Sequence, residues 1–415
     1  MHEIKDSGKT QARSRFFYGY VIVAASALIL VIMHGIGSSF GIFFNEFQEE
    51  FHWNRAAISG GTSISFFLLG MFSTVSGRIT DRYGPRVTMA ISALVLVAGY
   101  LLLSTTRSIW QFYLFYGVVI SLGNSGGDMA VLPTVARWFV KQRGLMSSIV
   151  KAGTGIGMFV MPLVSAWLIT SYNWRTAYMV LGIAAFVIII GFSRLLKRDP
   201  SEMGLKPYGT DERNVITGGI TDTGIGTREM LRTGRFWFLA GSYFLVWFVT
   251  QSTMVHIAPH GVDAGLSLAQ AAGILSIIGG VSIIGRLTMG NASDRIGMHK
   301  ALLVCFGVLL TAILLLQFTN QSWILYLFAP AYGFAHGGFF AIISPLVAEM
   351  FGIKSHAGNL GMLFFIGMSG GAIGPIITGR IFDTTGSYQA AFIMVLIATV
   401  VGFALALFVR RAKRR

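Results

Sequence analysis

GRITDRYGPR (77–86) and GNASDRIGMHK (290–300) are two copies of one short pattern, and they decide how the rest of the chain is understood. Asp81 and Asp294 occupy the same place in the two copies, 213 positions apart. The same offset relates further identical residues outside the two stretches, Gly157 with Gly370 and Pro162 with Pro375. Identical residues therefore recur 213 positions apart both inside and outside the quoted stretches. This indicates that the chain is built from two repeating halves.

The composition of the chain is that of a membrane protein. Of its 415 residues, 54% are hydrophobic and only 12% are charged, whereas soluble domains carry about 25% charged residues. This composition excludes a disordered chain, which would be poor in apolar residues, and a soluble multidomain enzyme, whose surface needs more charge. The 51 glycines against nine prolines suit closely packed membrane helices.

Twelve apolar stretches are long enough to cross a bilayer, which takes about 20 residues. They lie at 16–44, 56–77, 87–104, 108–137, 143–170, 175–195, 235–258, 268–291, 300–319, 322–351, 357–382 and 388–409. We therefore expect an all-α membrane protein with twelve transmembrane helices in two pseudo-symmetric six-helix bundles. Transporters built from such repeats bind solute between the bundles, near the membrane midplane.

The polar stretches between the spans predict the domain organisation. The longest of them separates six spans from six and has no apolar period until its end. The predicted order is a tail at 1–15, a bundle at 16–195, a cytoplasmic linker at 196–234, a second bundle at 235–409 and a basic tail at 410–415.

The net charge of +15 is explained by topology. With both termini in the cytoplasm, only four of the 32 Lys and Arg residues lie outside, namely Arg55, Arg107, Arg175 and Arg380. This is the positive-inside distribution of a multi-pass protein of the cell (inner) membrane, and it removes the reason to expect a nucleic-acid partner. The single cysteine, Cys305, allows neither a disulfide nor a metal cluster within the chain.

The repeated loop pattern resembles the G-x-x-x-D-R-x-G-[basic] motif of the major facilitator superfamily. It falls between spans two and three and again between spans eight and nine, as in that family. Longer stretches resemble the branch that contains oxalate/formate antiporters and monocarboxylate transporters: RWFVKQRGLMSSIVKAGTGIGMFVMP (137–162), EMLRTGRFWFL (229–239), GRLTMGNASDRIG (285–297) and GAIGPIITGRIFDTTGSYQAAF (371–392). The resemblance implies a carrier of small organic carboxylates, coupled to a proton or to a second anion.

The repeated loop is a candidate gate. Gly77 and Gly84 permit tight backbone turns, and a fixed carboxylate can face the positive N-terminal end of a helix. The resemblance implies that Asp81 faces the start of span eleven and that Asp294 faces the start of span five. The alternative is a topology signal with a turn. The motif residues are Gly77, Asp81, Arg82, Gly84, Arg86, Gly290, Asp294, Arg295 and Gly297.

Three charged residues lie inside the spans, where charge is costly and marks candidate functional sites. Arg286, Asp128 and Lys151 all lie about 12–13 Å from the cytoplasmic ends of their helices, at 1.5 Å per residue. The guanidinium of Arg286 matches a carboxylate bidentately, and the resemblance places the substrate-binding arginine of this branch there. Asp128 and Lys151 lie on consecutive antiparallel spans and can meet as an ion pair. That pair is either structural or a part of the anion and proton path.

Further polar residues of the spans are candidate substrate contacts. His34 and His336 fall near mid-membrane, and each is a substrate contact or a packing residue. A proton carrier would be Asp128 or a histidine such as His336. Asn124, Tyr116 and Tyr332 would either bind substrate or bond neighbouring helices within one half.

The chain departs from the branch at three positions. By resemblance, the span-eleven lysine of the antiporter aligns with Gly367. The span-one lysine of the monocarboxylate transporters aligns with Ser38, and their span-eight aspartate aligns with Ser282. The doubly cationic site for a dianion is therefore absent in its usual arrangement.

These observations predict a secondary active transporter that moves a small organic anion, most simply a monocarboxylate, by alternating access. It would need no cofactor and no metal, would act as a monomer in the lipid bilayer, and would not be an enzyme. The alternatives are an oxalate/formate-type dicarboxylate antiporter and a membrane solute receptor that does not transport. Proton symport and anion exchange both remain open.

Overall fold

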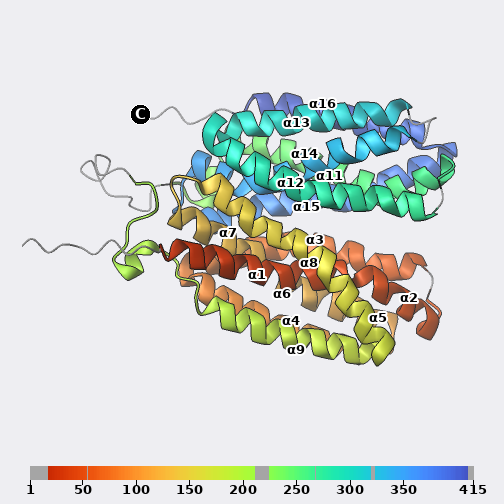
Figure 1. Ribbon diagram of the computed structural model, residues 1–415, viewed down its shortest axis with the longest axis horizontal. Coiled ribbons are helices and arrows are strands. Elements are labelled where there is room, and N and C mark those ends of the chain that lie inside the picture. The colour runs from red at the N-terminus through yellow and green to blue at the C-terminus, as the bar shows by residue number, and fades with distance from the viewer. Residues whose placement is uncertain (1–16, 54, 211–223, 267, 319–322, 410–415) are drawn as a thin grey trace, which may run out of the picture.

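The computed structural model describes residues 17–53, 55–210, 224–266, 268–318 and 323–409. The predicted tails at 1–15 and 410–415 and the middle of the linker lie outside these ranges. The described chain is a set of long helices, which Figure 1 shows in two groups that lie one above the other. The lower group runs from α1 to α9 and the upper from α11 to α16.

The helices of the first half are joined by short connections. In chain order they are α1 (Gly19–Ser38), α2 (Phe40–Phe51), α3 (Arg55–Tyr83), α4 (Pro85–Ser104), α5 (Ile109–Phe112), the π-helix η1 (Tyr113–Ile120), α6 (Ser121–Asn124), α7 (Gly126–Trp138), α8 (Arg143–Ser171) and α9 (Trp174–Ser193).

The helices of the second half are longer on average and less interrupted. They are α11 (Gly234–Asp263), α12 (Leu268–Ile296), α13 (Met298–Leu315), α14 (Ile324–Phe351), α15 (His356–Thr385) and α16 (Tyr388–Leu407). The short helix α10 (Thr227–Met230) precedes them.

Ten helices among the described residues are long and apolar enough to span a membrane. They correspond to ten of the twelve predicted spans. The other two spans are also helical. One is α3, which is rich in glycine, serine and threonine. The other is the succession α5–η1–α6–α7, which is divided by the π-helical turns at Tyr113–Ile120, so that no single piece of it is long. The architecture is therefore the predicted all-α membrane fold.

The two groups touch mainly along two helix pairs, α3 with α15 and α8 with α12, and to a smaller extent through α7 and α14. Glycines of the repeated motif allow this approach. A Cβ atom at Gly77 would overlap the carbonyl of Ala357, and one at Gly290 would overlap the side chain of Ser148. The turn predicted at Gly77 is wrong, because this residue lies inside α3 and serves close helix packing instead.

Glycine does form the turn at the end of each copy of the motif. Gly84 has a φ of +87° and Gly297 a φ of +91°, and each precedes the first residue of the next helix. Side chains with a Cβ rarely adopt this conformation. The two halves therefore use the same backbone geometry to turn from one span into the next.

The described ends of the linker are tied to both halves. The Tyr208 amide donates to the Trp138 carbonyl (2.9 Å), and the Ile225 amide donates to the Phe351 carbonyl (3.0 Å). The short backbone bridges that result involve Phe139 in the first half and Gly352 in the second. These two positions are also 213 residues apart, so the linker docks at equivalent places on the two halves.

Candidate functional site

The aspartates of the repeated motif join the two halves. Asp81 accepts hydrogen bonds from the amides of Ala357 (3.2 Å) and Gly358 (2.7 Å), at the start of α15. Asp294 accepts hydrogen bonds from the amides of Gly144 (2.8 Å) and Leu145 (2.9 Å), at the start of α8. Each carboxylate therefore caps the positive end of a helix from the opposite half, as the resemblance implied.

Arginines at the end of the molecule that carries the repeated motif differ in whether they bridge the two halves. Arg137 donates to the carbonyl of Ile353 across the halves (2.5 Å). In the first copy of the motif, Arg86 donates to the Leu196 carbonyl (2.6 Å), and the guanidinium of Arg82 lies over the ring of Tyr83 at 5.2 Å. The loop-motif end is thus closed by two aspartates and Arg137, while Arg82 and Arg86 stay within the first half.

Asp128 of α7 and Lys151 of α8 form the predicted ion pair. The Lys151 ammonium donates to both carboxylate oxygens, at 3.0 and 3.1 Å. Both residues are buried, with 8% and 5% of their surface exposed. His34 lies against the same carboxylate, with Nε2 3.6 Å from Asp128 Oδ2. Asp128 is therefore held between a lysine and a histidine from two different helices.

Arg286 faces this group from the second half. It is only 4% exposed, and its Nε and Nη1 atoms have no hydrogen-bond partner among the described residues. Nη1 lies beside Gly155 of α8, where a Cβ atom would be 2.9 Å away. Buried donors without partners are costly, so a hydrogen-bond acceptor placed beside Nε and Nη1 would be stabilised there.

The charged groups are close enough to influence one another. The charge of Asp128 acts on Arg286, and the charges of Arg286 and Lys151 act on His336. Nδ1 of His336 is buried and has no hydrogen-bond partner in the described structure. The structure therefore brings together five of the predicted site residues at the boundary between the halves.

Two hydrogen-bond donors near this site were not predicted from the sequence. They are Tyr243 and Trp247 of α11. The Tyr243 hydroxyl and the Trp247 indole N–H are buried and lie near one another, and neither makes a hydrogen bond of good geometry with the described residues. Tyr243 lies within electrostatic reach of Asp128, and Trp247 packs against Phe66 of the other half. The internal repeat could have pointed to Trp247. This residue lies 213 positions after His34, so it is the equivalent in the second half of a predicted site residue.

Two predicted contacts turn toward their own half. The Tyr332 hydroxyl donates to the Thr250 carbonyl at 2.7 Å. Tyr116 packs against the rings of Phe40 and Phe112. The geometry thus favours for these two residues the alternative of bonding and packing within one half. Asn124 lies beside the Tyr100 hydroxyl, but its Oδ1 is buried and has no hydrogen-bond partner among the described residues, so both of its alternatives stay open.

Comparison with known proteins agrees with this architecture. The sequence model of the Major Facilitator Superfamily matches residues 25–316 and 283–415. The chain belongs to the major facilitator superfamily. It is accordingly a multi-pass membrane transporter.

Relatives within the superfamily are similar over nearly the whole chain. Human "Monocarboxylate transporter 12" is 27% identical across 96% of this chain and 81% of that protein. The "Oxalate:formate antiporter" of Oxalobacter formigenes is 27% identical across 95% of this chain and 91% of that protein. The branch that the sequence resembled is therefore confirmed at the level of sequence similarity.

Solved structures share the fold. The fucose:proton symporter of E. coli superposes with a TM-score of 0.72 and 13% identity, over 95% of this chain and 100% of that chain. The human organic anion transporter MFSD10 superposes with a TM-score of 0.70 and 18% identity, over 94% of this chain and 99% of that chain.

The positions where this transporter departs from its branch have structural consequences. A Cβ atom at Gly367 would lie 2.6 Å from the Trp247 ring and 2.7 Å from the Tyr243 ring. The space that a side chain at Gly367 would need is thus filled by the rings of Tyr243 and Trp247. Ser38 and Ser282 bond carbonyls of their own helices, at Gly35 and Gly279.

Proposed function

We propose that this chain is a secondary carrier of small organic monocarboxylates that works by alternating access. The observation that carries the proposal is the buried guanidinium of Arg286, whose Nε and Nη1 donors are unpartnered in the described structure. A carboxylate can accept a hydrogen bond from either of these donors together with one from Nη2, in a planar fork. The substrate would therefore bind between the halves, between Arg286 and the Asp128–Lys151 pair.

The charge balance of the site favours a monoanion over a dianion. Lys151 and Arg286 contribute two positive charges, and Asp128 contributes one negative charge. One carboxylate neutralises the charge that remains. A dianion would leave an unbalanced negative charge in a region of low dielectric, which is unfavourable. The packing of Tyr243 and Trp247 at Gly367 also leaves no room for a further lysine there.

The same arrangement offers a route for coupling. An arriving carboxylate competes for the Lys151 ammonium, and Asp128 then loses its closest counter-charge. A carboxylate left in that environment gains affinity for a proton, and His34 lies 3.6 Å from it. Asp128 with His34 is therefore the proposed proton site, which favours proton symport over exchange. His336 is the second candidate of the proposal, since its Nδ1 is unpartnered in the described structure.

The names of the relatives support a small organic anion as substrate. Relatives at 25–27% identity are called monocarboxylate transporters and an oxalate:formate antiporter. We propose that this chain acts without a cofactor and without catalytic activity, and that it works as a monomer, because the site forms within one chain. We also propose that it lies in the cell membrane with both termini in the cytoplasm.

Counterflow in proteoliposomes tests the proposal. Vesicles loaded with unlabelled lactate, pyruvate, formate, acetate or oxalate are diluted into the radiolabelled form of the same compound. We expect transient accumulation with at least one of the four monocarboxylates and less with oxalate. Accumulation with oxalate alone would replace the proposal by the dicarboxylate antiporter. Binding of a monocarboxylate without accumulation would indicate a receptor.

The gate contacts lead to a prediction about conformation. Asp81→Asn and Asp294→Asn each weaken two charge-assisted bonds between the halves, which are worth about 1.5–3 kcal/mol apiece when intact. We expect the cytoplasm-open population to rise about tenfold in either variant. The measurement is labelling from the cytoplasmic side of a reporter at Ser147, one turn below Lys151 on α8, in a Cys305→Ser background.

The control for this measurement is Asp383→Asn, an exposed carboxylate at the far end of α15. It removes the same charge without touching the gate. Unchanged labelling in both gate variants would show that the repeated loop is only a topology signal.

The two donors of α11 lead to a second prediction. Tyr243→Phe removes a hydroxyl that has no partner in the described structure, so the stability of the protein should not fall. If the hydroxyl binds substrate, its loss costs about 1 kcal/mol, and KM should rise about fivefold. Tyr332→Phe is the matched control, because that hydroxyl is bonded within its half. A rise in KM for Tyr332→Phe alone would reverse the assignment.

A further inference from the structure

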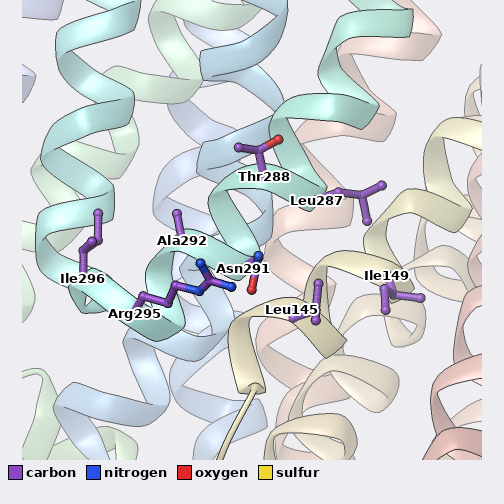
Figure 2. Close-up of a pocket in the computed structure, with 8 residues that line it drawn as sticks. All are labelled: Leu145, Ile149, Leu287, Thr288, Asn291, Ala292, Arg295 and Ile296. Carbon is purple, nitrogen blue, oxygen red and sulfur yellow. The ribbon is translucent and has the colours of Figure 1, made fainter.

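A groove on the bilayer-facing side of the molecule lies beside the gate at Asp294. It has a volume of about 640 Å³, and its walls come from both halves. Figure 2 shows Leu145 and Ile149 on α8 facing the groove from one side and a row of α12 side chains, from Leu287 to Arg295, on the other. The groove is thus separate from the proposed substrate site.

The groove is apolar along its length and basic at one end. Leu145, Ile149 and Leu287 supply apolar walls, and Leu287 is 37% exposed toward the bilayer. Leu287 and Arg295 are eight residues apart on α12, which spans about 12 Å along the helix axis. At the Arg295 end the groove joins a second hollow of about 460 Å³, which Lys141 also lines. This is the sequence of environments that a phospholipid meets from acyl chain to phosphate.

The charges at the basic end are available to a ligand. Arg295 makes no hydrogen bond or ion pair with the described residues, and Figure 2 shows its guanidinium directed toward Asn291. In the first half its counterpart Arg82 is engaged by the ring of Tyr83. Asp294 also lines the second hollow, but both of its oxygens accept hydrogen bonds from amides of α8. The free charge there is therefore positive.

We propose that this groove binds an anionic glycerophospholipid of the cytoplasmic leaflet. Its phosphate would lie between Arg295, Lys141 and Asn291, and one acyl chain would run along Leu145, Ile149 and Leu287. Basic residues at the cytoplasmic membrane surface attract anionic lipids by about 1 kcal/mol each. The proposal rests on the proposed orientation of the chain and not on the identity of its substrate.

Binding there favours one state of the transporter. The groove exists while the start of α8 is bonded to Asp294 and is divided when the two halves separate at this end. A ligand that contacts both walls binds the closed arrangement more tightly and shifts the population toward it. The anionic lipid is therefore an allosteric ligand that keeps the cytoplasmic gate closed.

Native mass spectrometry of the full chain in detergent tests the binding. Phosphatidylglycerol and phosphatidylcholine with the same acyl chains are titrated in parallel. We expect one saturable phosphatidylglycerol, bound about 30-fold more tightly than phosphatidylcholine, because two cations contribute about 1 kcal/mol each. Arg295→Gln should remove this preference. Arg82→Gln, the same change at the equivalent gate position of the other half, should retain it.

Two further arms separate the possible outcomes. Ile149→Trp fills the apolar part of the groove and should weaken phosphatidylglycerol while Arg295 is intact, which keeps the test valid if Arg295→Gln does not fold. Glycerol 3-phosphate and inorganic phosphate are added as competitors and should not displace the lipid. Displacement by either would show a site for soluble anions and overturn the proposal, as would equal binding of the two lipids.

The conformational arm uses the Ser147 reporter in vesicles. Replacing part of the phosphatidylcholine by phosphatidylglycerol should lower labelling from the cytoplasmic side severalfold in the reporter protein that retains Arg295. The same replacement should have no effect in the Arg295→Gln variant. Unchanged labelling in the native gate would contradict the allosteric part of the proposal.

Discussion

Arg286→Lys is expected to lower kcat/KM for the transported carboxylate by roughly 100-fold, while the protein folds normally. Lysine keeps the positive charge but loses the planar pair of donors. The loss of one charge-assisted bond to a carboxylate costs about 1.5–3 kcal/mol. The measurement is the initial rate of uptake into proteoliposomes, for the substrate that counterflow identifies, over a range of concentrations.

The control for this change is Ser282→Ala, one turn earlier on α12. The Ser282 hydroxyl bonds only the Gly279 carbonyl of its own helix, so uptake should stay near the native rate. Thermal stability of both variants in detergent separates a lost contact from a lost fold. Uptake at the native rate by a stable Arg286→Lys protein would remove Arg286 from the substrate site.

Asp128→Asn and Lys151→Gln are each expected to lower the free energy of unfolding by about 3–5 kcal/mol, and the double variant to recover most of it. Either single change leaves one buried charge without its partner at 3.0 Å. Removing both leaves two neutral amide side chains of similar size, which can bond one another. Thermal unfolding of the four proteins forms a double-mutant cycle.

Transport by the stable double variant then decides the role of the pair. The proposed coupling route predicts a folded but inactive protein, because the carboxylate that accepts the proton and the ammonium that meets the anion are both missing. Full activity would make the pair structural. Losses that add without recovery would contradict the interaction itself. His34→Gln, which leaves the Lys151 contact intact, should destabilise the protein far less.

Much of this protein could be predicted from its sequence, because the bilayer imposes length and depth on every span. A helix that crosses about 30 Å of hydrocarbon needs about 20 apolar residues, so the apolar stretches indicated the spans. The rise of 1.5 Å per residue placed Asp128 and Lys151 at matching depths on consecutive spans, and the structure pairs them. The resemblance of the repeated loop to the family motif likewise indicated which helix starts lie opposite Asp81 and Asp294.

The rotation of each helix about its axis was decided only by the tertiary structure. Lipid-facing and buried faces of a membrane helix are both apolar, so periodicity does not tell which face a lone polar residue occupies. Tyr332 and Tyr116 therefore looked as suitable for the substrate path as Arg286, yet they turn toward their own half. Tyr243 and Trp247, which were indistinguishable from core aromatics, bring free donors toward the site. Trp247 packs against Phe66 of the opposite half, and Tyr243 packs against Phe364 of its own half. These contacts join residues far apart in the sequence, so they exist only once the helices have assembled.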